Sequence, residues 1–405
     1  MSAIKPILSA MLRSRSAPVL LLLQIILSVA IVANAAFIIH QRLGLMERDS
    51  GVAEAEVLSF KLYNFGDGVD LKERSRRDLD LLRTLPGVKT VAPVNMLPLG
   101  SSGWRSGFVD GPDPDTAKSL PGMAVYMGDE NLLETFGLKL IEGRNFIPGR
   151  IAEGLNDTEV PREVIVTKAY AKAAFGDESP IGKRVYEGGI TAFTIVGVVD
   201  KLQSAWVNDD EVENSVLVNV NMNGTGQFNT MVVRAEAVDH ARLTDAIKEV
   251  LHRDDPRRVL FSFKSIAQYR ESAYAQHAMM AFVLGAMIVL LLAITALGLS
   301  GMVMFNIERR TKQIGTRRAL GATRGNILGW FLTENYLLLG TGALVGSLLA
   351  FELSRQLMDF FSLDALAWQY PAVTVVLLFV VTTIAVIIPA RRAAAISPSI
   401  ATRSV

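Results

Sequence analysis

Four apolar runs divide the chain into membrane and non-membrane parts. They cover residues 16–39, 278–305, 327–351 and 370–390. Each run reaches the roughly 20 residues that an α-helix needs to cross a bilayer, and only the third carries a charge, Glu334. A long polar stretch, 40–277, separates the first two runs. This pattern predicts an α-helical membrane protein with four transmembrane helices and one large domain outside the membrane.

The first run also fits a secretory signal peptide, because basic residues precede it and Ala33-Asn34-Ala35 resembles a cleavage site. The apolar run continues beyond that site through Phe37, Ile38 and Ile39. This continuation favours an uncleaved membrane anchor.

The distribution of Lys and Arg orients the chain, because basic flanks stay in the cytoplasm. The connection 306–326 holds six basic residues against one acid, whereas 40–277 holds 28 basic and 35 acidic residues. The ends of the chain carry basic residues and no acids, and 352–369 carries more acids than bases. We therefore expect 1–15, 306–326 and 391–405 in the cytoplasm and the other two segments outside.

The pattern within 40–277 predicts a mixed α+β domain. A strand, a helix and a strand are expected at 54–62, 71–85 and 88–97, and again at 230–235, 239–252 and 259–263. Two such β-α-β units make a ferredoxin-like subdomain, and about 111–225 is predicted as an inserted β-rich subdomain. An amphipathic stalk is expected at 264–277, leading into the second span, and 40–56 is expected to continue the first span outward.

Composition excludes several kinds of chemistry. The 41 basic and 40 acidic residues give no basic domain for nucleic acid, and the absence of Cys excludes disulfides and thiolate metal sites. The four His are scattered, which argues against a histidine-rich metal centre. The acidic clusters at 113–115 and 209–213 lack EF-hand spacing and are predicted as solvated loops.

The connection between the second and third runs carries the most information. With the start of the third run it reads NIERRTKQIGTRRALGATRGNILGWFLTEN. Ile307 and Ile314 are seven residues apart and share a helical face, Gly321 suits a left-handed helix end, and Thr323 suits the cap of a new helix. These signals predict a short helix at the inner membrane surface. Its basic residues fit two interpretations: a loop that binds anionic membrane lipids, or a coupling helix that docks on a cytoplasmic partner.

Several segments resemble the MacB/FtsX-like family of ABC transporter permeases. In the connection and the tail these are IGTRRALGATRGNIL and PARRAAAISPSIATRS. In the large domain LPGVKTVAPVNMLPL, LLETFGLKLIEGRNF, VIVTKAYAKAAFGDESPIGKRV and FTIVGVVDKL are similar, in that order, to the MacB-type periplasmic core domain. The resemblance covers nearly the whole chain.

The resemblance implies a bacterial inner-membrane permease with a two-part periplasmic domain and two permease copies per complex. A cytoplasmic ABC ATPase would drive motion of the periplasmic domains through the connection and the stalks. The residues carried over as the ATPase-coupling set are Glu308, Arg309, Arg310, Ile314, Gly315, Arg317, Arg318, Ala319, Leu320, Gly321 and Ala322. Thr316 departs from the family, which usually has an aliphatic residue there, so a polar contact is expected to alter the seating of the connection.

No phosphate-binding loop is found in the sequence. In GDESPIGKR the two glycines, Gly176 and Gly182, are one residue too far apart, and Arg184 stands where Ser or Thr is needed. We therefore expect this chain to bind no cofactor, with ATP and Mg²⁺ on a separate subunit.

Two intramembrane features have alternative interpretations. Glu334 is predicted to form an ion pair with an arginine such as Arg317 or Arg318, with proton transfer as the alternative. Gly342 and Gly346, with Gly340 nearby, are predicted to form a close-packing helix surface, within one subunit or between two.

The function predicted is that of a non-catalytic permease subunit for export of peptides, antibiotics or other amphiphiles, with a homodimer or heterodimer of permeases and a periplasmic adaptor left open. Lipoprotein release and control of cell-wall hydrolases are alternatives within the same family. A membrane-anchored sensor would associate with a kinase instead, and an ectoenzyme would need a catalytic constellation that the sequence does not contain.

Overall fold

The computed structural model describes residues 16–66, 70–113, 115–188, 191–361 and 365–394. The chain forms two compact units: a helical unit, residues 1–46 with 277–405, and an α+β unit, residues 47–276. The predicted cytoplasmic segment 1–15 and most of the predicted tail, 395–405, lie outside the described residues.

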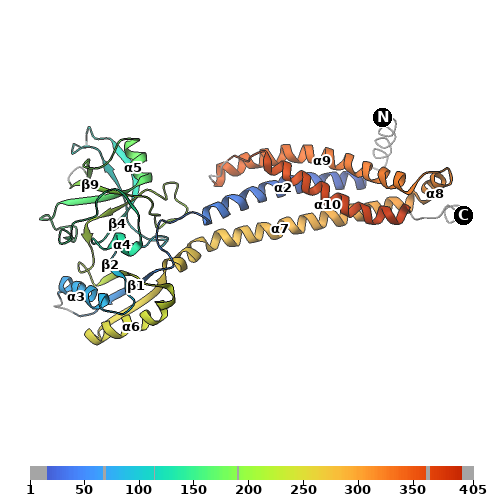
Figure 1. Ribbon diagram of the computed structural model, residues 1–405. Helices are drawn as coiled ribbons and strands as arrows, with labels where there is room; N and C mark the ends of the chain where they lie inside the picture. The colour runs from blue at the N-terminus through green and yellow to red at the C-terminus, as the bar shows by residue number, and fades with distance from the viewer. Residues whose placement is uncertain (1–15, 67–69, 114, 189–190, 362–364, 395–405) are drawn as a thin grey trace. The chain divides into compact units, whose positions relative to one another are not determined.

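Four helices of the described chain are long and apolar enough to cross a membrane. They are α2 (Ser16–Met46), α7 (Ile266–Arg309), α9 (Arg324–Phe361) and α10 (Gln369–Ala394), with the short α8 (Thr311–Ala319) between α7 and α9 (Figure 1). Each is longer than the apolar run that predicts it. The helical extension of the first span ends at Met46, so the expectation that it continues to residue 56 is wrong, whereas α7 begins at Ile266 and includes the predicted stalk.

Three of these helices pack against one another inside the helical unit. Residues of α2, α9 and α10 form apolar clusters, one of which contains Ile25, Val29, Leu339 and Leu378. The apolar window of α2 is 50% buried, whereas that of α7 is only 6% buried. Helix α7 contacts α2 through a hydrogen bond of 3.0 Å between the hydroxyls of Ser28 and Thr295. Most of the apolar surface of α7 therefore has no partner within the described part of this chain.

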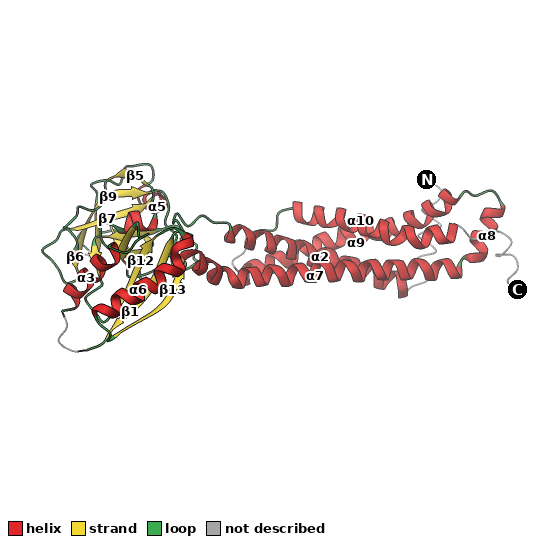
Figure 2. Cartoon of the chain, turned by 60° about the horizontal axis from the view of Figure 1, so that its bottom comes forward, coloured by secondary structure: helices red, strands yellow, loops and turns green. Residues whose placement is uncertain are grey.

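The α+β unit contains an antiparallel four-stranded sheet in the order β13-β1-β12-β2 (Figure 2). The strands are β1 (Val57–Asn64), β2 (Thr90–Pro93), β12 (Phe228–Arg234) and β13 (Arg258–Ser265). Helices α3 (Leu71–Arg83) and α6 (His240–Asp254) supply Leu79, Leu82 and Leu243 to a core shared with this sheet. Two β-α-β units are therefore present where the sequence predicts them, although β2 is shorter than the expected strand 88–97.

A second sheet of seven strands, in the order β5-β9-β7-β10-β4-β3-β8, lies between the two β-α-β units in the sequence. Its strands are β3 (Arg105–Val109), β4 (Ser119–Met127), β5 (Leu140–Gly143), β7 (Arg162–Thr167), β8 (Arg184–Glu187), β9 (Thr191–Val199) and β10 (Ser215–Val218). An additional pairing of β8 with β9 closes six of these strands into a ring. The sheet begins at Arg105, earlier than the expected 111, because β3 pairs with β4 and β8.

Besides a one-turn 3-10 helix, Ala237–Asp239, four shorter elements lie in the described part of the α+β unit. They are the helices α4 (Leu132–Phe136) and α5 (Lys168–Phe175), and the paired strands β6 (Ala152–Glu153) and β11 (Val220–Asn221). Tyr170 of α5 packs edge-on against Phe108 in the core of the seven-stranded sheet, where Phe193 and Val216 are also buried. Each sheet therefore has its own apolar core.

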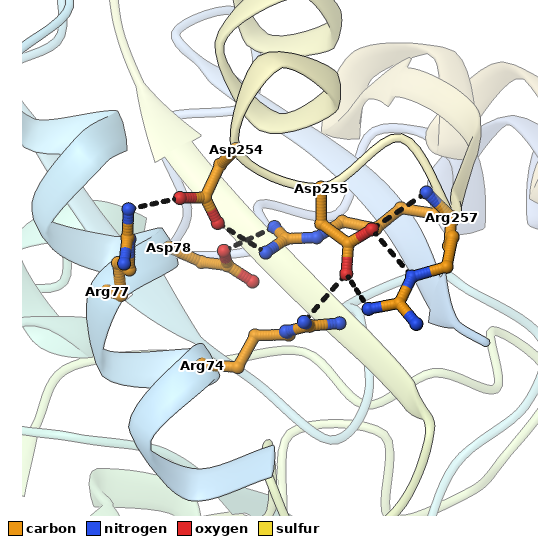
Figure 3. A network of polar contacts seen from close by, with 7 residues as sticks. Arg74, Arg77, Asp78, Asp254, Asp255 and Arg257 are labelled. Carbon is orange, nitrogen blue, oxygen red and sulfur yellow. Dashed lines mark hydrogen bonds and ion pairs between the residues drawn. The ribbon is translucent and has the colours of Figure 1, made fainter. Parts of the chain in front are cut away.

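A buried ion network joins α3 to the end of α6 and the start of β13 (Figure 3). The Arg258 guanidinium bonds Asp78 and lies 2.7 Å from Asp254, which also pairs with Arg77 at 2.6 Å. The side chains of Arg258 and Asp78 are fully buried. Burial raises the pKa of Asp78 from 3.8 to about 6, despite the nearby arginine. This network fixes helices of both β-α-β units to one another.

The pKa of a neighbouring carboxylate in this network, Asp255, shifts in the opposite direction. Asp255 accepts hydrogen bonds from the side chain and backbone N–H of Arg257 and pairs with Arg74 at 2.6 Å. These donors, with Arg257 first, lower the pKa of Asp255 from 3.8 to about 2. Asp255 therefore stays ionised where Asp78 takes up a proton.

Candidate functional site

The connection between α7 and α9 folds as its local sequence signals predict. Helix α8 ends with Gly321 at a φ of 98°, where Gly321 N–H bonds the Arg318 carbonyl at 3.1 Å and Ala322 N–H bonds the Arg317 carbonyl at 3.0 Å. This pair of bonds is the Schellman arrangement that a left-handed glycine permits. The Thr323 hydroxyl then accepts a bond from Asn326 N–H at 3.2 Å and caps α9. Both predicted helix ends are confirmed.

One side of α8 is buried against the membrane helices. Ile314 is fully buried in a cluster with Val303 of α7, Phe331 of α9 and Val386 of α10, and Gly315 beside it is also buried. Ile307, seven residues earlier, lies at the end of α7 and packs against the same cluster. Both isoleucines contact one apolar cluster, but they belong to two helices, so the prediction that they share a face of one helix is wrong.

Glu334 forms an ion pair with Arg310, not with Arg317 or Arg318. The distances from the Arg310 guanidinium nitrogens to the Glu334 carboxylate oxygens are 3.0 and 3.4 Å. The carboxylate side chain is 5% exposed. Arg310 stands at the start of α8, directly after α7, and can therefore reach back to α9. The prediction of an ion pair is confirmed and its predicted partner is corrected.

Trp330 reinforces this attachment of α8 to α9. The guanidinium carbons of Arg310 and Arg317 lie 5.1 and 4.6 Å from the centroid of the Trp330 ring, within cation–π distance. The sequence reasoning did not single out Trp330. Its signal was present, because a tryptophan close to a cluster of arginines is the ring that binds guanidinium groups best.

The predicted coupling residues divide into three groups by exposure. Glu308, Arg309, Arg317, Ala319, Leu320 and Gly321 are exposed. Arg310, Arg318 and Ala322 are partly buried, and Ile314 and Gly315 are buried. Leu320 has 82% of its surface exposed, which is unusual for a large apolar residue beside a basic helix. We refer to Arg309 at the end of α7, Arg317 of α8 and Leu320 directly after it as the exposed α8 surface.

Thr316 is exposed, and its hydroxyl donates to the Lys312 carbonyl at 2.9 Å. A threonine that bonds the carbonyl four residues earlier satisfies its own polar group inside the helix. The departure from the family at this position therefore places no unsatisfied hydroxyl on α8.

The predicted glycine surface packs inside this subunit. A Cβ at Gly342 would lie 2.6 Å from Ile25 of α2, and one at Gly346 would lie 2.8 Å from Val29 of α2. Gly340 has no neighbouring atom within 4 Å. Of the two alternatives, the structure supports packing of α9 against α2 within one chain.

A second group of contacts fixes the first turns of α7 to the α+β unit. The Arg270 guanidinium forms two hydrogen bonds of 2.6 Å with the Glu54 carboxylate and donates to the Arg48 carbonyl at 2.8 Å. One turn later, the Tyr274 hydroxyl accepts a bond of 2.9 Å from the buried Gln203 amide. We call Glu54, Arg270, Gln203 and Tyr274 the stalk clamp. The sequence predicts the stalk but not these pairs, which join residues far apart in the chain.

An arginine forms ion pairs with carboxylates of the acidic loop 209–213. The Arg105 guanidinium bonds Asp209 and lies 3.0 Å from Glu211. Within the described ranges, no group of three or more His, Asp or Glu residues is arranged to hold a metal ion.

Comparison with known proteins covers both units. The MacB-like periplasmic core domain family matches residues 19–250, more than half of the chain, and the FtsX-like permease C-terminal family matches residues 285–398. The chain belongs to the MacB/FtsX-like permease family. Its α+β unit is the MacB-like periplasmic core domain, and the four apolar helices make it a membrane permease component.

Curated relatives include the macrolide export ATP-binding/permease protein MacB of Neisseria meningitidis, 27% identical over 350 residues that cover 83% of this chain and 50% of the relative. MacB of Acinetobacter baylyi is 25% identical over 366 residues, with 87% and 52% covered. The chain spans about half the length of the curated relatives it matches. The crystallised periplasmic region of MacB from Actinobacillus actinomycetemcomitans is 18% identical, with 56% of this chain and 97% of that chain covered and a TM-score of 0.33.

Proposed function

We propose that this chain is the permease subunit of a MacB-like ABC transporter and passes the energy of ATP hydrolysis from a separate cytoplasmic ATPase to its periplasmic core domain. The observation that carries the proposal is the two-sided α8. Its buried side is attached to α9 by the Arg310–Glu334 pair, whereas Arg309, Arg317 and Leu320, which lie in α8 or next to its ends, are exposed. An exposed apolar residue together with arginines is the composition expected at the centre of a protein contact.

Helix α7 supplies a direct route for transmission. It is continuous over 44 residues, which corresponds to about 66 Å at 1.5 Å per residue. Its cytoplasmic end leads into α8, and the stalk clamp holds its first turns within the periplasmic core domain. A displacement of α8 would therefore be carried along one helix.

The proposal places ATP and Mg²⁺ on the partner ATPase, and this chain contributes neither a catalytic group nor a cofactor site. It also places both termini in the cytoplasm of a bacterial cell, with the protein in the inner membrane. The basic connection and the basic residues of 1–15 and 391–405 support this orientation.

A second permease copy, identical or related, would cover the apolar surface of α7. The low burial of α7, compared with that of α2, supports this part of the proposal. Export of a peptide, antibiotic or other amphiphile, with or without a periplasmic adaptor, is the task we propose. The strand order β13-β1-β12-β2, with one helix after β1 and one after β12, supports a ferredoxin-like description of the four-stranded sheet.

A matched pair of variants tests the docking role. Leu320 and Val238 are both apolar residues with most of their surface exposed, 82% and 89%, but Val238 lies in the periplasmic core domain. Leu320→Asp should abolish recovery of an ATP-binding subunit when the tagged chain is purified in mild detergent, and Val238→Asp should leave recovery unchanged. Full recovery with Leu320→Asp, or recovery of a kinase in place of an ATPase, would overturn the proposal.

A further inference from the structure

Two adjoining cavities open beside the four-stranded sheet of the periplasmic core domain. Their volumes are about 460 and about 260 Å³, and Asn95, Trp104, Phe228 and Thr230 line both. A single cleft of this size falls within the range of about 300–1,000 Å³ that is typical of small-molecule sites. We call it the Trp104 cleft.

One wall of the Trp104 cleft is the sheet face opposite α3 and α6. In β1 the side chains of Phe60 and Leu62 point into the core shared with these helices, so Lys61 and Tyr63 point to the other face. Phe228 of β12 lies opposite Tyr63 in the antiparallel register and is 49% exposed. This face therefore presents the rings of Tyr63 and Phe228 to the cleft.

The other wall is a loop, residues 95–104, that holds an exposed tryptophan. Leu99 and Ser101 have φ angles of 61° and 60°, although neither is glycine. Such conformations cost on the order of 1–3 kcal/mol each and persist only where the surroundings enforce them. Here Leu99 N–H bonds the Ser204 carbonyl at 3.2 Å and Ser101 N–H bonds the Ala205 carbonyl at 2.9 Å.

The backbone hydrogen bonds of Leu99 and Ser101 help to fix the position of Trp104. Its backbone N–H donates to the sulfur of Met96 at 3.3 Å, so both ends of the loop are tied together. The indole remains 43% exposed. A strained, well-anchored loop that keeps a large ring open to solvent is typical of a binding site, because a purely structural loop gains nothing from exposing it.

The charges of the cleft select among ligands. Among the described residues that line the two cavities, Lys61 is the only charged one. Among the described residues, no carboxylate lies within ion-pair distance of its ammonium, which instead lies 5.7 Å from the centroid of the Phe228 ring. An anionic group placed here would gain a charge-assisted hydrogen bond without displacing an existing partner.

We propose that the Trp104 cleft binds an acidic amphiphile, with a flat ring system against Trp104 and Phe228 and its acidic group on Lys61. Stacking on aromatic side chains favours planar ring systems, and the ammonium of Lys61 favours an acid over an amine or a neutral analogue. Binding at this cleft does not require the ATPase. Only its use as the uptake site of an exported compound rests on the proposed function.

Fluorine NMR of the full-length chain in nanodiscs tests this proposal. The chain has four tryptophans, so 5-fluorotryptophan labelling gives few signals, and Trp104→Phe assigns the one of interest. The probes are 2-naphthoxyacetate, its neutral amide and the corresponding 2-naphthoxyethylamine. The acid should shift the Trp104 signal saturably and bind at least about 5-fold more tightly than the other two probes, while the Trp206 signal stays unchanged.

Substitutions at Lys61 separate charge recognition from simple apolar binding. Lys61→Met should remove the preference for the acid, and Lys61→Arg should retain it. The proposal is overturned if none of the probes shifts the Trp104 signal saturably, if the three probes bind equally to the wild type, or if Lys61→Met keeps the preference. Equal shifts of all four tryptophan signals would indicate partition into the bilayer and would also overturn it.

Discussion

Two arginine–carboxylate pairs in this protein lie in different surroundings. In the periplasmic core domain, Arg258 and Asp78 are fully buried, and the neighbouring Asp254 also bonds Arg258. In the connection between α7 and α9, Arg310 is 21% exposed and Glu334 is 5% exposed, and the next turns of α8 present basic residues to solvent. The first pair is enclosed within one fold, and the second attaches a small helix whose outer side is open.

The difference indicates that an arginine–carboxylate pair stabilises the fold in the periplasmic core domain, whereas the Arg310–Glu334 pair positions α8. Removing one member of an enclosed pair leaves a buried charge, whose cost appears in the free energy of unfolding. Removing Glu334 leaves Arg310 close to solvent, so its main effect should be on the position of α8. The following predictions test this distinction in order of expected effect.

Arg258→Met should destabilise the periplasmic core domain by about 3–5 kcal/mol, because Asp78 loses its partner in a buried site. Arg253→Met is the matched control, since Arg253 pairs with Glu249 at the surface, with side-chain exposures of 74% and 69%. The control should change stability by less than about 0.5 kcal/mol. Denaturant unfolding followed by tryptophan fluorescence measures both, and equal effects would contradict the structural role of the network.

Glu334→Gln should lower the ATPase activity of the purified complex about 10-fold while the chain still folds, equivalent to about 1.4 kcal/mol for the lost charge-assisted pair. Glu352→Gln, an exposed carboxylate on the same helix, should have no effect. The double exchange Arg310→Glu with Glu334→Arg should restore part of the activity. A loss with Glu334→Gln that the exchange fails to restore would argue against the ion pair as the positioning contact.

The enclosed pair should also produce a pH effect. Because the pKa of Asp78 is about 6 in the folded protein and 3.8 in the reference state, the folded chain holds an extra proton between pH 4 and 6. Lowering the pH from 7 to 5 should therefore stabilise the wild type relative to Asp78→Asn by about 1 kcal/mol. Melting temperatures of both proteins at the two pH values measure this difference, and the same pH dependence for both would show that Asp78 stays ionised.

Local sequence signals predicted much of the connection between α7 and α9. Gly321 and Thr323 act through their own backbone and side chain, so the ends of α8 and the start of α9 follow from a few neighbouring residues. The partner of Glu334 could not be predicted from these local signals. Arg310, Arg317 and Arg318 all lie within a few helical turns of one another, and only the packing of α8 selects among them. The role of each residue in docking stays a prediction.

In the periplasmic core domain, too, local sequence patterns predicted elements but not the contacts between distant residues. Alternation in β1 and the leucine spacing of α3 and α6 predicted two β-α-β units, because each pattern is local. The loop that carries Trp104 was not predicted, since the positive φ angles of Leu99 and Ser101 depend on bonds to residues 204 and 205. The Arg270–Glu54 clamp likewise joins residues separated by most of the domain.

Cross-linking from the exposed α8 surface tests the central claim most directly. The natural chain has no cysteine, so Leu320→Cys and the control Val238→Cys each carry a single thiol for a benzophenone maleimide. In intact cells, irradiation should link position 320, and not position 238, to an ATP-binding protein identified by mass spectrometry. Absence of an ATP-binding protein from the products at position 320 would contradict the account.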